Sequence, residues 1–406
     1  MKKPELLAPA GDMEKLKVAV AYGADAVYIG GRHFGLRAGA GNFNEEELAS
    51  GVEYAHKHKV KVYVTANIFA HNDDLKQLPA FLETIGKAEA DGVIVSDPGV
   101  LAICRRQLPE MPVHLSTQAN ATNWAAVAFW TEQGVKRIIL ARELSLKEIE
   151  EIHRRMAGVE LEMFVHGAMC VSYSGRCLLS NYFTGRDANR GDCAQSCRWK
   201  YALMEEKRPG LFLPIREDDR GTYILSAGDL CLLRYIPELA AAGIDSFKIE
   251  GRMKSVHYVA GVVKAYREAI DGYYGGERAA WDPQYGLDEL SKVSHRAFST
   301  GFLFDRPGET EQVDSDGLYR REYSFIGLVK SYNPDTGMAL VEQRNHFSLG
   351  DRIEIMTPVG KPFQQTIDRI YDQEGNAVST APHPQQLLEI PVTRQVSPYS
   401  LLRKLK

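Results

Sequence analysis

The sequence predicts an α/β fold: a (β/α)8 barrel of the TIM type, with a cysteine-rich insertion after the seventh strand and a small C-terminal all-β barrel domain. Three observations lead to this prediction. Eight short and nearly continuously apolar runs alternate with amphipathic segments, as expected for buried parallel strands joined by helices. A long stretch without a clear period separates the seventh run from the eighth. Strand-like alternation dominates the last part of the chain.

The apolar runs define the expected barrel strands, which are Glu5–Pro9, Ala26–Gly30, Val60–Ala66, Gly92–Ser96, Val113–Thr117, Arg137–Ala141, Glu160–Val165 and Ser246–Glu250. Helices are expected at Glu45–His58, Asp74–Ala90, Ala121–Gln133, Leu146–Met156, about Asp229–Ala242 and about Ser255–Tyr273. Asp229 is the expected N-cap of its helix. A doubly wound open sheet is the alternative. It would require a glycine-rich phosphate turn after the first strand, and Pro9-Ala10-Gly11-Asp12 is not one.

Changes in pattern divide the chain into three parts. Residues 1–275 form the expected barrel domain, with the cysteine-rich insertion at 167–228, and residues 276–322 connect it to a β-barrel domain at 323–406. By analogy with small β-barrels attached to RNA-handling proteins, the last part and its basic end, Arg403-Lys404-Lys406, are expected to anchor RNA; the alternative is a domain that only covers apolar barrel surface. The expected strands there are Phe325–Val329, Met338–Gln343, Arg352–Met356 and Phe363–Tyr371.

Composition limits the classes of partner. The formal net charge is −4, from 49 basic and 53 acidic residues, so the chain has no global basic signature for nucleic acid, although a local basic face is compatible with it. No long apolar run follows the two N-terminal lysines, and no stretch approaches the ~20 apolar residues that span a bilayer. We therefore expect a soluble, cytoplasmic protein without a membrane partner, in which thiols stay reduced.

Five of the six cysteines gather in one region: Cys170, Cys177, Cys193, Cys197 and Cys231. Three interpretations compete. Structural zinc commonly uses paired C-x2–4-C knuckles, and only the pair at 193 and 197 has that spacing. An iron–sulfur cluster accepts more irregular spacing. Free buried cysteines that act as small hydrophobes are the third interpretation, and it suits the sixth cysteine, Cys104, which lies in a helical pattern.

Polar residues at the ends of the expected strands are candidates for chemistry, because barrel enzymes carry their active sites at the carboxyl ends of the strands. His166, Lys248 and Glu250 are the candidate catalytic residues. No H-E-x-x-H or G-x-S-x-G motif is present, and Asp335-Thr336-Gly337 fits a hairpin turn better than an aspartic-protease site.

Three arginines are candidates for binding substrate. Arg37, Arg142 and Arg252 fall on loops or strand ends at the same face of the expected barrel. A guanidinium group can donate two parallel hydrogen bonds to a carboxylate. We therefore expect these arginines to hold a carboxylate substrate.

Several motifs resemble the signature of the collagenase-like peptidases, peptidase family U32. They are the run Glu162–Cys170 (EMFVHGAMC), its continuation Ser174–Ser180 (SGRCLLS), the stretch from Gly191-Asp192-Cys193 to Cys197-Arg198-Trp199, and Lys248–Arg252 (KIEGR). The resemblance covers essentially the whole chain. Its C-terminal part is similar to that of the branch of the family that hydroxylates tRNA.

The resemblance implies an iron–sulfur protein that takes part in hydroxylating wobble uridine of tRNA to 5-hydroxyuridine, with prephenate as the dicarboxylate co-substrate. It implies a [4Fe–4S] cluster on Cys170, Cys177, Cys193 and Cys231, with Cys197 as the alternate to Cys193. The expected partners are tRNA and either a second copy of the chain or a related family member. The alternatives are a collagenase-like peptidase and a non-catalytic, zinc-containing RNA-binding protein.

Overall fold

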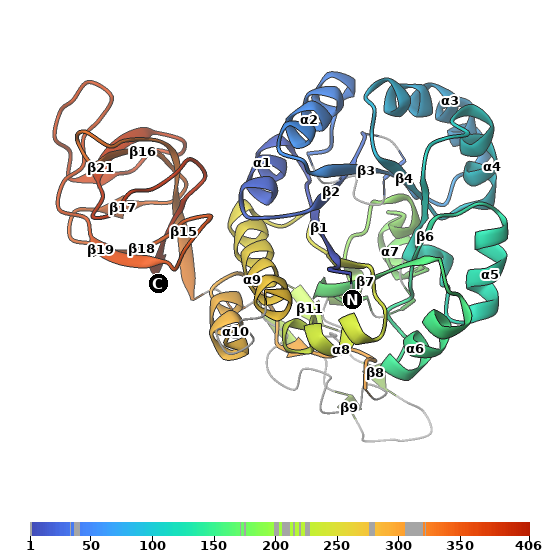
Figure 1. Ribbon diagram of the computed structural model, residues 1–406. Helices are drawn as coiled ribbons and strands as arrows, with labels where there is room; N and C mark the ends of the chain where they lie inside the picture. The colour runs from blue at the N-terminus through green and yellow to red at the C-terminus, as the bar shows by residue number, and fades with distance from the viewer. Residues whose placement is uncertain are drawn as a thin grey trace.

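The computed structural model describes residues 2–32, 34–35, 41–170, 172–173, 176–198, 203–204, 212–213, 216–218, 221–223, 228–275, 281–304, 320 and 322–406. A closed barrel surrounded by helices lies beside a smaller antiparallel β domain (Figure 1). The predicted fold class is confirmed. Within the described residues, no helix is long and apolar enough to cross a bilayer.

Eight parallel strands form the barrel: β1 (Glu5–Pro9), β2 (Ala26–Gly30), β3 (Lys61–Ala66), β4 (Gly92–Val95), β5 (Val113–Leu115), β6 (Arg137–Ile139), β7 (Glu160–Ala168) and β13 (Ser246–Ile249). Each strand pairs with the next one in this order, and β13 pairs with both β7 and β1, which closes the ring. The strands are almost entirely buried, which explains why their sequences read as continuous apolar runs.

Helices cover the outside of the barrel: α1 (Met13–Ala21), α2 (Glu45–Lys57), α3 (Asn72–Lys87), α4 (Pro98–Gln107), α5 (Trp124–Glu132), α6 (Leu146–Arg155), α8 (Ile236–Ala241) and α9 (Val256–Tyr274). Local sequence sets where several of them begin. Asn44 and Glu47 form a capping box at the start of α2, and Ser145 and Glu148 form another at the start of α6. Ser255 caps α9 by accepting a hydrogen bond from the Tyr258 amide.

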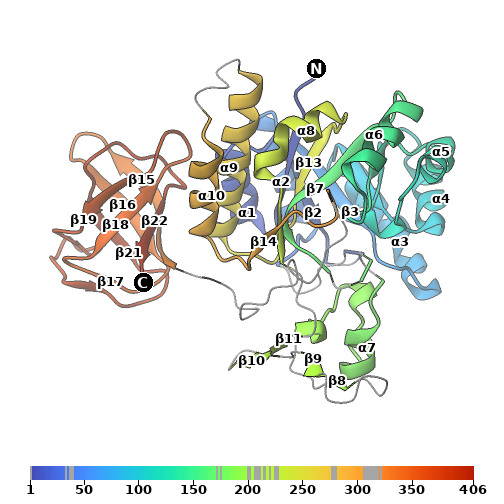
Figure 2. The ribbon, with the colours of Figure 1, turned by 90° about the horizontal axis from the view of Figure 1, so that it is seen from below.

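The insertion after β7 contains α7 (Leu179–Thr184) and the short strands β8 (Leu203–Met204), β9 (Phe212–Leu213), β10 (Arg216–Asp218) and β11 (Gly221–Tyr223). Figure 2 shows these elements below the barrel, with α7 on the side far from the C-terminal domain. The insertion follows β7, and it therefore extends from the carboxyl ends of the barrel strands, where barrel enzymes place their chemistry.

The predicted helix at Asp229–Ala242 is wrong in its first part. Asp229–Cys231 is a strand, β12, antiparallel to β7, and α8 begins only at Ile236. Asp229 is buried and does not cap a helix: its carboxylate accepts hydrogen bonds from the Arg296 guanidinium at 2.8 and 3.0 Å. The segment that connects the two domains contains α10 (Pro283–Ser291) and β14 (Phe298–Ser299), which pairs with β12.

The C-terminal domain has a six-stranded antiparallel sheet in the order β19 (Phe363–Thr366), β18 (Arg352–Met356), β22 (Leu401–Leu405), β15 (Tyr323–Asn333), β16 (Met338–Gln343) and β21 (Leu387–Pro391). The short strands β17 (Phe347–Ser348) and β20 (Thr380–Ala381) pair with each other. The predicted turn at Asp335-Thr336-Gly337 is confirmed, because it joins β15 to β16 in a hairpin. Strands β21 and β22 were not predicted.

Buried charges join the two domains. Arg403 on β22 is fully buried, and its guanidinium contacts Glu289 of α10 and, at 2.7 Å, Glu354 of β18. Lys404 lies 2.6 Å from Asp351. The expectation that the basic C-terminal end contacts RNA phosphates is therefore wrong for Arg403, because burial and two carboxylates already satisfy its charge.

Candidate active site

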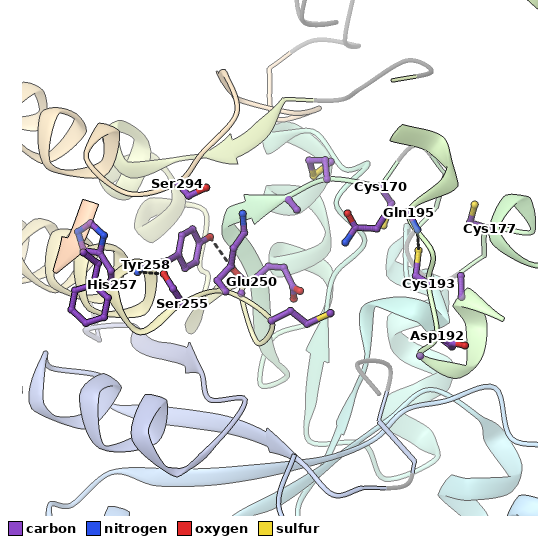
Figure 3. A pocket seen from close by; sticks show the side chains of 18 of the residues that line it. Cys170, Cys177, Asp192, Cys193, Gln195, Glu250, Ser255, His257, Tyr258 and Ser294 are labelled. Atoms are coloured by element: carbon purple, nitrogen blue, oxygen red, sulfur yellow. Dashed lines mark hydrogen bonds between the residues drawn. The ribbon is translucent and has the colours of Figure 1, made fainter. Parts of the chain in front are cut away.

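A cavity of about 730 Å³ opens at the carboxyl ends of the barrel strands. Its volume is in the range of small-molecule sites. Three parts of the chain form its wall, and Figure 3 shows Cys170, Cys177 and Cys193 on one side with Glu250, Ser255 and Tyr258 on the other. The lining includes Gln118, Arg142 and Glu250 of the barrel, Lys254 and Ser255 at the start of α9, and Tyr323, Phe325, Asn345 and Lys406 of the C-terminal domain.

A second, smaller cavity of about 40 Å³ lies deeper in the mouth of the barrel. It shares Gln118, Arg142 and Glu250 with the large cavity, so the two adjoin. Most of its lining is polar and comes from strand ends: Tyr28, Thr65, Asn67, Ser116, Thr117, Lys248 and Arg252. The structure therefore brings together four of the predicted site residues, Arg142, Lys248, Glu250 and Arg252.

Arg252 is buried, and neutral oxygens orient its guanidinium. Its Nη1 donates to Thr65 Oγ1 at 2.9 Å, and its Nη2 donates to Asn42 Oδ1 at 2.7 Å. Gly30 at the end of β2 makes room for this group, because a Cβ atom there would overlap the guanidinium. The arginine is thus held in one orientation at the mouth of the barrel.

Arg142 approaches the cavities from the end of β6. Its Nη1 donates to the Ala168 carbonyl oxygen at 2.7 Å, and its guanidinium lies 4.1 Å from the centre of the Phe164 ring. Its buried Nε has no hydrogen-bond partner among the described residues. Arg142 can therefore donate a further hydrogen bond to a group that enters the mouth.

Lys248 lines the small cavity and belongs to a buried charge network. Its Nζ lies 2.8 Å from Glu162 Oε1, and Arg137 contacts the other oxygen of Glu162 at 3.2 Å. Burial by itself would raise the pKa of Glu162, but Lys248 and Arg137 hold that pKa below its ordinary value. Burial lowers the pKa of Lys248, and Glu162 opposes this shift.

Glu250 lines both cavities directly after β13. Its Oε2 accepts a hydrogen bond from the Tyr28 hydroxyl at 3.2 Å, and its backbone amide donates to the His166 carbonyl oxygen at 2.9 Å. The carboxylate therefore lies where the two cavities adjoin, and it offers a group there that can exchange a proton.

His166 lies elsewhere. It is buried outside both cavities, with its ring centre 5.5 to 5.9 Å from the rings of Tyr266, Phe298 and Tyr258. Burial lowers its pKa to about 3, so the imidazole is neutral at physiological pH. Arg37, the third predicted substrate-binding arginine, falls outside the described residues.

The cysteines are only partly brought together. Cys170, Cys177 and Cys193 line the large cavity, but Cys231 is buried in β12 and lines a separate cavity of about 450 Å³. Burial raises the pKa of the Cys231 thiol to about 11. Cys104 is buried in the core, as predicted.

The three cavity thiols are suitable donors for an iron–sulfur cluster. In the described part of the chain, however, no three His, Cys, Asp or Glu side chains lie close enough together to hold a metal ion. The donor chemistry therefore fits such a cluster, whereas the side chains of the described residues are not gathered into a metal site.

Several lining residues were not predicted. Tyr28 and Thr65 belong to strands that read as apolar, although a threonine at the carboxyl end of β3 is a usable signal. The contribution of Tyr323, Phe325 and Asn345 has no local signal, because it depends on how the C-terminal domain packs against the barrel.

Comparisons with known proteins identify the family. Residues 11–313 match peptidase family U32, and residues 321–403 match the peptidase family U32 C-terminal domain. Bacillus subtilis tRNA hydroxylation protein P1 is 47% identical over 403 residues, which cover 99% of this chain and 95% of that protein. Escherichia coli tRNA hydroxylation protein P is 38% identical, covering 100% of this chain and 97% of that protein.

A more distant relative acts on a different RNA. The Escherichia coli 23S rRNA 5-hydroxycytidine synthase is 34% identical over 330 residues, which cover 80% of this chain and 48% of that protein. The resemblance found in the motifs is thereby confirmed over nearly the full length of the chain, and this protein belongs to peptidase family U32.

Proposed function

We propose that this protein is an RNA-modifying enzyme that hydroxylates tRNA, and that its product is 5-hydroxyuridine at the wobble position. The relatives that align with nearly the whole chain are named as tRNA hydroxylation proteins, and a more distant one as an rRNA hydroxycytidine synthase. The observation that carries the proposal is the large cavity, in which three cysteines face the polar mouth of the barrel. Such a cavity offers one place for a nucleotide, an acidic co-substrate and a redox group.

The dicarboxylate co-substrate, prephenate in this proposal, is held by Arg142 and Arg252. Both guanidinium groups line the small cavity, whereas the ammonium group of Lys248, which also lines it, is paired with Glu162. Fixed, partly buried guanidinium groups are effective partners for carboxylates. Arg37 remains a predicted third ligand.

The cofactor of this proposal is a [4Fe–4S] cluster held by Cys170, Cys177 and Cys193, with Cys231 as the fourth ligand and Cys197 as the alternate to Cys193. When bound, such a cluster supplies one-electron transfer. The support for it is the chemistry of the donors and the shared cavity wall of the first three thiols. Glu250 is the residue to which we assign proton transfer, because it lines both cavities.

The direct test is the nucleoside content of tRNA. Bacteria that lack their own tRNA hydroxylation proteins should regain 5-hydroxyuridine when they express this chain, as measured by mass spectrometry of digested tRNA. A tRNA pool that stays unmodified despite soluble, cluster-loaded protein would contradict the proposal.

The family name makes a peptidase the alternative, and the same protein tests it. The Ser255 hydroxyl caps α9, which is a structural role, and this proposal assigns the three cavity cysteines to the cluster. We therefore expect no cleavage of gelatin by the purified chain. Cleavage that disappears in a Glu250→Gln variant would favour the peptidase.

Replacing Arg252 or Arg142 by glutamine should weaken the use of the dicarboxylate. A hydrogen bond to a charged group contributes about 1.5–3 kcal/mol, so each change should lower kcat/KM for the co-substrate roughly 10- to 100-fold. Initial rates of hydroxylation at increasing prephenate concentration measure this effect. Arg369→Gln, at an exposed position of the C-terminal domain, is the matched control and should leave the rates unchanged.

A further inference from the structure

The insertion exposes an unusual set of large side chains. In and just before α7, Tyr182 is 81% exposed, Leu178 is 70% exposed and Phe183 is 43% exposed, while Tyr173 nearby is 52% exposed. Four large hydrophobic or aromatic side chains within 11 positions are more than scattered surface residues, and clustered exposure of this kind marks interaction sites.

The short helix fixes how this surface is presented. The Tyr182 amide donates to the Leu178 carbonyl oxygen at 2.9 Å, so these two residues lie one turn apart on the same side. The rings of Tyr182 and Phe183 are 5.1 Å apart and nearly perpendicular. We call Leu178, Tyr182 and Phe183 the α7 platform.

The opposite side of α7 is anchored. Ser180 is buried, its hydroxyl donates to the Arg186 carbonyl oxygen at 2.7 Å, and it accepts from the Ala194 amide at 2.9 Å. This anchoring ties the helix to the segment that carries Cys193. The α7 platform is therefore the solvent-exposed side of a helix whose other side is held.

The platform adjoins the active-site cavity. Cys177, which lines the cavity, directly precedes Leu178, and Figure 3 shows it beside Cys193 on the same wall. In Figure 2, α7 lies below the barrel on the side away from the C-terminal domain. A ligand that lies across the platform can thus reach into the cavity.

The charge next to the platform is positive. Arg176 and Arg186 are exposed, although Arg186 also pairs with Asp192 at 2.7 Å. At the C-terminal end, Arg403 is fully buried between two carboxylates and is not accessible to phosphate, whereas Arg176 is exposed. Exposed aromatic rings combined with arginine are the composition that binds single-stranded RNA, by stacking on bases and contacting phosphates.

We propose that the α7 platform stacks unpaired bases of the RNA substrate and presents the neighbouring nucleotide to the cavity. This inference rests on the proposed function, since it names the part of the chain that holds the RNA. Positive charge beside the rings and continuity with the cavity favour an RNA loop over a second copy of the chain as the occupant.

The experiment compares RNA binding by the full-length chain and its variants, using fluorescence anisotropy with a labelled hairpin whose loop is unpaired. Loss of base stacking in Tyr182→Ala should weaken binding roughly 5- to 100-fold, and Tyr182→Trp should restore it. A duplex RNA of the same length should show no such difference. Phe129→Ala removes a side chain that is 53% exposed on α5, and it should bind like the wild type.

Salt dependence separates stacking from charge. Tyr182→Ala should keep the wild-type slope of log affinity against log salt, whereas Arg176→Gln should reduce the slope by about 0.7, as expected for one lost phosphate contact on a single strand. Equal affinity of the wild type and Tyr182→Ala for the hairpin would contradict the proposal that the α7 platform stacks RNA bases. So would a change from dimer to monomer in Tyr182→Ala, measured by light scattering, with RNA affinity unchanged.

The design also distinguishes failure of the platform from failure of the proposed function. If the wild type hydroxylates tRNA and Tyr182→Ala does so with unchanged RNA affinity, only the platform is wrong. If the wild type neither binds nor modifies RNA, the proposed function fails, and the platform fails with it.

Discussion

Replacing Cys170 or Cys177 by alanine should abolish both the iron and the acid-labile sulfide of protein purified without oxygen. Each of these thiols lines the large cavity, and losing one of four thiolates removes one of the bonds that hold the cluster. The wild type should be brown under these conditions. Iron and sulfide analysis, with zinc measured in the same samples, gives the result.

Matched variants show which thiols matter. Cys104→Ala changes a cysteine in the barrel core and should keep the full iron and sulfide content. Comparing Cys193→Ala with Cys197→Ala decides which of the two is a ligand, and Cys231→Ala tests the buried thiol of β12. Stoichiometric zinc without iron in the wild type would overturn the cluster and favour structural zinc.

Arg403→Met should lower the free energy of unfolding of the protein by about 3–5 kcal/mol. This is the usual cost of leaving buried charges without their partner. Arg403 is fully buried between Glu289 and Glu354, so its replacement leaves two carboxylates without this partner. Urea unfolding followed by tryptophan fluorescence and circular dichroism measures the change. Arg352→Met, at an exposed position of β18, should be nearly neutral.

The effect of Arg403→Met should depend on pH. Burial by itself would raise the pKa of Glu354, but Arg403 and Lys292 hold it below its ordinary value. A carboxyl group with a lowered pKa in the folded state contributes stability above its unfolded pKa, about 4.3, and loses it as the pH falls. The difference between the wild type and Arg403→Met should therefore shrink when unfolding is repeated near pH 4. A difference that is equal at both pH values, or absent at pH 7, would contradict this account of the interface.

The sequence by itself determined the barrel, because a parallel strand buried on both faces is a continuous run of apolar residues. β1 and β2 were predicted with their observed bounds, and the remaining barrel strands differ only at their ends. The polar residues that follow such strands were also informative. Arg142, Lys248, Glu250 and Arg252 meet at one mouth, since parallel strands of a closed barrel end at the same face.

Only the tertiary structure decided which partner each buried polar group has. Asp229 looked like a helix cap, but it lies in a strand and pairs with Arg296, 67 positions away. Arg403 was predicted to contact RNA phosphates, but in the structure its guanidinium is paired with Glu289 and Glu354.

The same limit applies to the site. His166 and Cys231 occupy neighbouring strands outside the main cavity, and the C-terminal domain completes the cavity wall. A local pattern records whether a residue is buried, but the identity of its neighbours depends on contacts between distant segments, which no window of sequence contains.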